Sequence, residues 1–94
     1  MSLKRQNTVG FDIIFVYAAE KFGVIHNRAN KMFFESEIFT YKGYDNLSRA
    51  ELRWDLKELE KENKSEDAER ILALKILISY MHRNHIRDLL VLCN

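Results

Sequence analysis

The sequence predicts an all-α fold, a small bundle of four to five helices around one central apolar helix at about residues 65–83. Three observations support this class. The chain contains no proline and only three glycines, which favours long helices over a fold with many turns. Hydrophobic residues make up 47% of the chain, so it can form a globular core. The stretch from Ile71 to Met81 is apolar around most of a helical circumference, so other helices must cover it.

One helical domain is expected over residues 1–94, with residues 1–7 flexible because they are polar and precede any periodic pattern. Thr8 can cap a first helix that ends at about Phe22. Gly23 then accepts the left-handed conformation that commonly ends a helix. A second helix is expected from about Asn27 to Phe39. The residues of this helix expected to face inward are Ala29, Met32, Phe33 and Phe39.

The third helix has the clearest start signal in the chain, after a loop over residues 41–46. Ser48 and Glu51 have the spacing of a capping box, in which each side chain bonds to the backbone amide of the other. Leu47 and Leu52 are placed as a hydrophobic staple across the same turn. The sequence therefore predicts a helix that starts after Ser48.

The central helix is expected to begin at Ser65, whose hydroxyl can cap it and which is followed by two acids. The third and central helices should form an antiparallel hairpin. Two interpretations remain for the chain after Met81. Either the helix breaks near His82 and Asn84 starts a short last helix, or the helix continues to Leu92.

The corner between the first two helices contains a small residue, Ala19, a turn glycine, Gly23, and an apolar residue, Val24. Together with Ala29 and Met32 at inward positions, this segment resembles the helix-turn-helix motif of DNA-binding proteins. The resemblance implies that one set of polar side chains faces the major groove, where Asn suits adenine and Arg suits guanine. These DNA-contact candidates are His26, Asn27, Arg28, Asn30 and Lys31. The alternative is an ordinary helical corner with a solvated polar face.

A second resemblance spans Tyr17 to Leu59. A helix with Tyr and Ala, a helix with Phe, and the residues Tyr44, Asp45 and Leu47 before an acidic helix follow one another in this order. This order is similar to a family of short uncharacterised bacterial helical proteins encoded near toxin-like genes. The similarity implies a small regulatory or antitoxin-like protein.

Candidates for a protein interface are Trp54 and the terminal residues Leu89, Leu90 and Leu92. Trp54 lies opposite the buried stripe of its own helix, where an aromatic side chain is typical of an interface anchor. Alternatively, its ring folds back onto the domain. The three leucines belong to an apolar run that must be covered by the domain or by a partner. A homodimer or another protein partner is therefore expected.

No catalytic motif is present, so an enzyme and a small-molecule substrate are not expected. His82 and His85 lie one helical turn apart, with Asp88 and Cys93 nearby. A closed metal site needs four well-placed ligands, so neither a metal nor another cofactor is expected.

The net charge of +1 gives no general attraction to DNA or an anionic membrane, so DNA binding would require a local basic patch. No apolar run is long enough to span a membrane. The single cysteine fits a cytoplasmic protein. The function predicted is a non-enzymatic interaction or regulatory protein that binds another macromolecule, foremost a protein, through apolar helical surface. The alternative is a helix-turn-helix transcriptional regulator or antitoxin-like protein.

Overall fold

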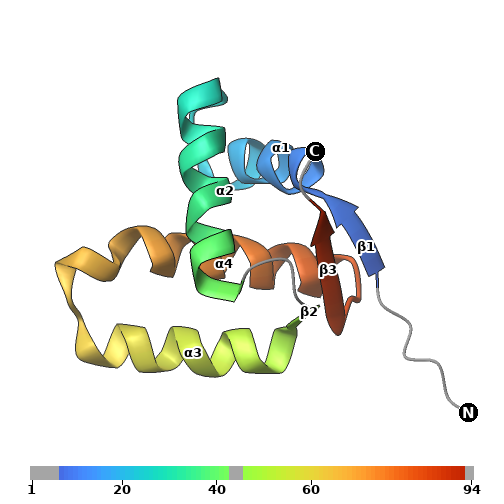
Figure 1. The fold of residues 1–94 in the computed structure, drawn as a ribbon. Helices are drawn as coiled ribbons and strands as arrows, with labels where there is room; N and C mark the ends of the chain where they lie inside the picture. The colour runs from blue at the N-terminus through green and yellow to red at the C-terminus, as the bar shows by residue number, and fades with distance from the viewer. Residues whose placement is uncertain (1–6, 43–45, 93–94) are drawn as a thin grey trace, which may run out of the picture.

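The computed structural model describes residues 7–42 and 46–92 of the chain. In chain order the elements are β1 (Asn7–Gly10), α1 (Phe11–Phe22), α2 (Arg28–Lys42), β2 (Asn46–Ser48), α3 (Arg49–Glu62), the 3-10 turn η1 (Ser65–Asp67), α4 (Ala68–Arg83) and β3 (Asp88–Leu92). Helices α3 and α4 form an antiparallel hairpin, as predicted, and α1 and α2 lie on the other side of α4 (Figure 1). The strands meet at one end of the hairpin.

The chain is mostly helical, but the prediction of an all-α fold is wrong. A three-stranded sheet has the order β1-β3-β2, with β1 parallel and β2 antiparallel to β3. Both predicted helical continuations beyond residue 83 are wrong, because residues 88–92 form the middle strand. A short, continuously apolar run fits a buried strand as well as a buried helix, so its periodicity does not identify it. Its partner strands lie far away in the sequence.

Helix α4 ends in a Schellman motif, although no glycine marks its end. His85 has the left-handed conformation, with φ of 55°. The amide of Ile86 donates to the carbonyl of Met81 at 2.8 Å, and the amide of His85 donates to that of His82 at 3.2 Å. This pair of bonds defines the motif, and the buried Ile86 supplies its usual apolar contact. The helix therefore turns back toward the sheet.

The first helix does not use Thr8 as its cap, because Thr8 belongs to β1 and pairs with Leu90. Helix α1 instead begins at Phe11 after the extended Gly10. Of the residues expected to be flexible, residues 1–6 lie outside the described residues and Asn7 begins β1.

The buried face of α2 differs from the predicted one. Phe34 and Ile38 are buried, whereas Ala29, Met32 and Phe33 are exposed. Phe34 packs against Phe11 and Phe15 of α1, with ring centroids 5.7 and 6.4 Å apart. Phe39 is partly buried, 6.2 Å from the ring of Phe11. The sequence contains enough aromatic residues along α2 to fit either face, and packing against α1 selects one.

Helix α3 begins at the predicted position, after Ser48, but the Ser48 side chain makes no capping hydrogen bond. Ser48 is held as the last residue of β2, paired with Asp88, and the amide of Arg49 donates to the carbonyl of Arg87 at 2.9 Å. The predicted staple residues Leu47 and Leu52 are both buried in the core. The sheet therefore fixes this helix start.

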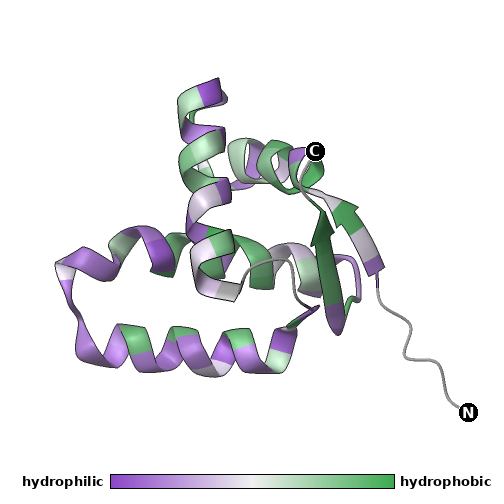
Figure 2. Cartoon of the chain, in the orientation of Figure 1, coloured by the Kyte–Doolittle hydropathy of each residue, from purple (hydrophilic) through white to green (hydrophobic). Residues whose placement is uncertain are grey.

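The central helix is the hub of the core, as predicted, although it begins later than expected. Ser65 starts η1 rather than capping α4, which begins at Ala68. Helices α1, α2 and α3 all contact α4. Figure 2 shows that α1, α4 and β3 are largely hydrophobic, whereas α3 is hydrophilic over most of its surface. The buried side chains of α4 are Ala73, Leu74, Ile76, Leu77 and Met81.

The position of β3 predicts different effects for two leucines on opposite faces of one strand. Leu89 is fully buried, whereas Leu92 is 44% exposed. Leu89→Ala should lower the free energy of unfolding by about 2–5 kcal/mol, because the change leaves a cavity in the core. Leu92→Ala should change it by less than about 1 kcal/mol. Urea unfolding measures both, and equal effects would contradict the assignment of Leu89 to the core.

Contacts between α1 and α4 predict a dependence of stability on pH. The hydroxyls of Tyr17 and Ser79 share a hydrogen bond, and the Tyr17 and Tyr80 rings meet edge to face, 5.4 Å apart. Burial raises the pKa of Tyr80 above its ordinary value of 10.0. The folded chain therefore holds this proton more tightly than the unfolded chain, so stability is lost as the pH rises through the folded-state pKa. Below pH 10.0 the contribution is fully present.

Tyr80→Phe should therefore reduce the loss of stability in alkaline solution. The measurement is the free energy of unfolding in urea, from neutral pH to above the ordinary tyrosine pKa, for the wild type and the variant. Identical alkaline slopes for the two proteins would contradict a contribution from Tyr80.

Candidate functional site

Five of the seven large hydrophobic residues that are exposed in the described chain belong to the corner formed by α1, residues 23–27 and the first two turns of α2. The large hydrophobic residues exposed there are Ile13, Val16, Ile25, Met32 and Phe33. In the rest of the described chain only Trp54 and Leu92 are comparably exposed. Single exposed apolar residues are common on proteins, but several on neighbouring elements are typical of an interaction site. We call this surface the corner.

The corner is fixed by two helix ends. Gly23 closes α1 with φ of 69°, and its amide donates to the carbonyl of Ala18. A Cβ at Gly23 would meet no atom within 4 Å, so the requirement for glycine is conformational rather than spatial. The side-chain oxygen of Asn27 accepts the amide of Asn30 at 2.8 Å and so caps α2. The Asn30 side chain in turn donates to the carbonyl of Ile25 at 2.9 Å.

A hollow of about 570 Å³ opens between α1 and the start of α2. Its lining residues are Asp12, Phe15, Val16, His26, Asn27, Arg28 and Lys31. The His26 ring stacks on Phe15, with centroids 5.2 Å apart and planes 29° apart. Lys31 forms an ion pair with Asp12, and both side chains remain partly exposed. The hollow thus combines an aromatic and aliphatic wall with a partly neutralised basic rim.

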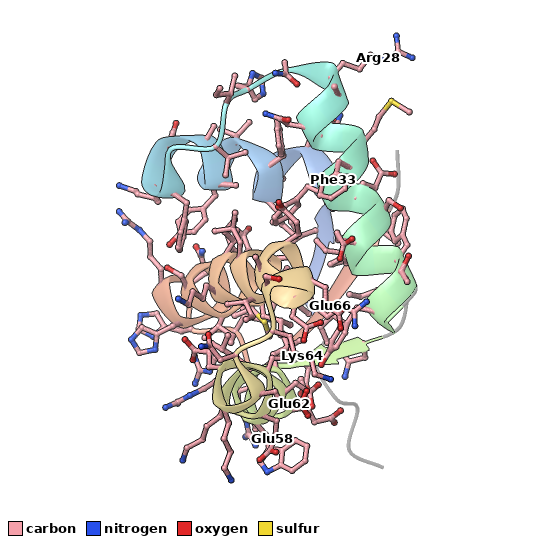
Figure 3. The ribbon with its side chains drawn as sticks, turned by 90° about the vertical axis from the view of Figure 1, so that its left-hand side faces the viewer. Arg28, Phe33, Glu58, Glu62, Lys64 and Glu66 are labelled. Atoms are coloured by element: carbon pink, nitrogen blue, oxygen red, sulfur yellow. The ribbon has the colours of Figure 1, made fainter. Side chains whose placement is uncertain are left out.

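The structure brings the five DNA-contact candidates together at the start of α2, but most of them make contacts with other residues of the chain. Asn27 and Asn30 build the turn, and Lys31 is paired with Asp12. His26 stacks on Phe15. Arg28 is the exception: it lies at the protruding tip of α2 (Figure 3) and forms no ion pair with any described residue. Four of these five polar side chains therefore stabilise the corner, and within the described residues Arg28 alone of the five is left as a free cation.

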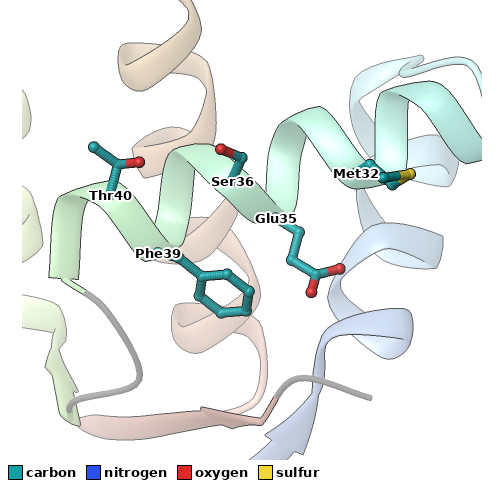
Figure 4. Close-up of a pocket in the computed structure, with 5 residues that line it drawn as sticks. All are labelled: Met32, Glu35, Ser36, Phe39 and Thr40. Atoms are coloured by element: carbon teal, nitrogen blue, oxygen red, sulfur yellow. The ribbon is translucent and has the colours of Figure 1, made fainter.

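A second hollow, of about 400 Å³, follows α2 away from its start. It is lined by Met32, Glu35, Ser36, Phe39 and Thr40. In Figure 4 the side chains of Glu35 and Phe39 point to the same side of the helix, toward the sheet. Met32 belongs to both this hollow and the corner, and the other lining residues are polar except for Phe39.

The other interface candidates have different environments. Trp54 is 64% exposed, so its ring does not fold back onto the domain. Leu92 is exposed and Leu90 is partly buried, on the face of β3 that points away from the helices. Leu89 is buried on the opposite face, so its prediction as an interface residue is wrong. Successive side chains of a strand point to opposite faces, so Leu89 lies on one face and Leu90 and Leu92 on the other, whereas a helix would place all three in one apolar segment.

Several corner residues were missed or misplaced by sequence reasoning. Ile13 and Val16 lie off the buried stripe of α1, which helical periodicity could have shown. Ile25 lies in a connection without any periodic pattern. Met32 and Phe33 were expected to face inward and do not.

Among the residues described, no group of three or more His, Cys, Asp and Glu side chains is placed to hold a metal ion, and Cys93 lies outside them. No helix in the described part of the chain is both long enough and apolar enough to cross a bilayer. No protein-family model matches the chain, and neither a curated protein nor a solved structure matches it significantly.

Asn27 allows a test of how the corner is built. Asn27→Ala should lower the free energy of unfolding by about 1 kcal/mol, because α2 loses its N-terminal cap. Asn27→Ser should retain most of the stability, since a serine oxygen can accept the same amide. Thermal or urea unfolding compares the two variants with the wild type. An Asn27→Ala variant as stable as the wild type would show that the cap is unimportant.

Proposed function

We propose that the protein is a non-enzymatic, regulatory interaction protein that binds another protein through the corner. The observation that carries this proposal is that five of the seven large exposed hydrophobic residues of the described chain belong to the corner, with Ile25 the most exposed at 70%. Burying such side chains against a partner is favourable by roughly 25 cal/mol per Å² of apolar surface. The adjoining hollow offers a concave apolar wall that can receive an anchor side chain of the partner.

A protein partner fits this surface better than a DNA duplex does. DNA binding depends on several cations that are free to contact phosphates. At the corner Lys31 is already paired with Asp12, and Asn27 and Asn30 are used by the turn. The surrounding exposed side chains, Val16 and Ile25 among them, are apolar. The balance of surface chemistry therefore supports a protein as the partner.

A DNA-binding regulator or antitoxin-like protein is the second candidate. One observation favours it: Arg28 lies at the projecting start of α2, where a recognition helix would enter the major groove (Figure 3). Only one unpaired cation supports this placement, so it ranks below the first proposal.

The protein-binding proposal predicts that two apolar-to-charged substitutions at the corner weaken association without unfolding the chain.

A photoreactive amino acid at Ile25 should crosslink a discrete partner in cells, whereas the same group at the exposed Glu69 should not. Val16→Glu with Met32→Glu should weaken binding of the purified partner at least tenfold. Leu92→Glu is the matched control, because Leu92 is an exposed apolar residue on another surface. Crosslinking that is no more specific at residue 25 than at residue 69 would refute the proposal.

The DNA candidate predicts a different result. Fluorescence anisotropy should detect binding of a random-sequence duplex at low salt. Arg28→Ala with Lys31→Ala should weaken that binding and reduce its salt dependence, because fewer phosphates are contacted. Arg83→Ala with Arg87→Ala removes the same charge from exposed positions outside the corner and serves as the control. A wild type that binds no duplex at low salt excludes this candidate.

A further inference from the structure

The outer face of α3 is a second surface, separate from the corner. Leu52, Leu56 and Leu59 point from α3 toward the core, and Trp54 lies on the opposite side, 64% exposed. Helix α3 forms the lower edge of the molecule in Figures 1 and 3, and the corner lies on the far side of α4. The outer face is therefore open along its length within the described structure.

Charges on this face are segregated by sign on the two sides of Trp54. With 3.6 residues per turn, one flank of the helix carries cations and the other carries acids. The cations are Arg53, Lys57 and, almost in line with Trp54, Lys61; the acids are Glu51, Asp55, Glu58 and Glu62. One acid, Glu60, lies on the cationic side, nearer α4. Every pair of charged residues four apart within α3 has the same sign. Such pairs destabilise an isolated helix, whereas opposite charges at this spacing stabilise it.

The described chain does not neutralise the basic flank. Neither Arg53 nor Lys57 has an ion-pair partner among the described residues. Glu60, one turn after Lys57, is paired with Lys75 of α4 at 3.6 Å. Arg53, Lys57 and Glu60 also line a hollow of about 450 Å³ beside Trp54, with Leu56 and Ile78. Arg53 and Lys57 are both exposed, so acidic side chains of a partner can reach them, whereas Glu60 in the same hollow is turned to Lys75.

We propose that the occupant of this face is a second copy of the chain, whose α3 lies parallel to the first about a two-fold axis along the helices. In this arrangement the basic flank of each copy meets the acidic flank of the other on both sides of the axis. An antiparallel pair would place like charges together, as in antiparallel coiled coils where each flank meets its own equivalent. The segregation of charge thus selects the parallel orientation.

The heights of the charges along the helix agree with this pairing. A parallel two-fold axis keeps each residue level with its equivalent in the second copy. With a rise of about 1.5 Å per residue, Glu58 comes within about 1.5 Å of the level of Lys57 of the other copy. Asp55 comes within about 3 Å of the levels of Arg53 and Lys57 of the other copy. Trp54 meets its equivalent at the centre, and the small Ala50, one turn earlier, leaves space for the indole rings.

The size of this contact predicts a weak dimer. One pair of four-turn helices buries less than the roughly 1,200 Å² at the lower limit of stable interfaces. Exposed charge pairs supply its specificity, and salt screens them. Sedimentation velocity should show self-association at high micromolar concentrations and low salt, with a clear shift to monomer at high salt. A wild type that remains monomeric at low salt and submillimolar concentration overturns the proposal.

Charge reversal tests the pairing of the flanks. Arg53→Glu with Lys57→Glu leaves Lys61 as the last cation of the basic flank, and Asp55→Lys with Glu58→Lys replaces the two acids of the other flank that lie level with Arg53 and Lys57. Each variant alone should be monomeric, and an equimolar mixture should form a heterodimer at least tenfold tighter than either self-association. Recovery in the mixture also shows that both variants are folded. Lys21→Glu with Arg83→Glu changes the net charge equally at exposed sites on other elements and should leave the dimer intact. A mixture that fails to associate although both variants are folded overturns the proposal.

A cysteine tests the orientation. Ala50→Cys in a Cys93→Ser background should form a disulfide between the two copies under mild oxidation, because a parallel dimer places both residues 50 at the same level. An antiparallel pair centred on Trp54 would place residue 50 opposite residue 58. Association without this disulfide overturns the parallel arrangement. Loss of association in Val16→Glu with Met32→Glu would instead place self-association at the corner, and would overturn the assignment to α3 without testing the corner's affinity for another protein.

Discussion

The burial of α4 is the constraint on which the rest of the structure depends. A helix with apolar residues on most of its circumference is stable in water only when neighbours cover it on several sides. Helices α1 and α2 cover one side, α3 covers the other, and the sheet lies at its C-terminal end. Each covering helix presents one face to α4, so its opposite face is left to solvent or to partners. The two candidate surfaces are these remaining faces.

The sheet performs a different task, because it joins segments from both ends of the chain. Strand β3 pairs with β1, which leads directly into α1, and with β2, which leads directly into α3. A single strand therefore sets where two of the covering helices begin. The left-handed His85 makes this possible, since it ends α4 and returns the chain to the sheet. The helices are placed by packing against α4, and their starting points are placed by backbone pairing with β3.

Local signals in the sequence predicted the parts of the fold that depend on neighbouring residues. The apolar circumference of α4, the stop at Gly23 and the start of α3 after Ser48 could all be predicted. The strands could not, because β3 is stabilised by partners distant in sequence. The buried face of α2 could not be predicted either. Phe33 and Phe34 are equally hydrophobic, and only packing against α1 determines that Phe34 is the buried one. Trp54 was predicted as an interface residue from its face alone, whereas the exposure of Ile25 requires the folded connection.

The two surfaces differ in chemistry, and their arrangement around α4 connects them. The corner is apolar and concave, which suits a partner that buries a few anchor residues. The outer face of α3 has an exposed tryptophan between a mainly basic and a mainly acidic flank, which suits a weak, oriented contact with an identical surface. The surfaces lie on opposite sides of α4 (Figure 1), so the proposed dimer through α3 would keep both corners free. Such a dimer would present two binding sites, and a partner with two matching sites would be bound more tightly through the increased effective concentration of the second contact. A weak dimer is sufficient for this effect, because binding of a bivalent partner to both corners itself stabilises the association of the two α3 helices.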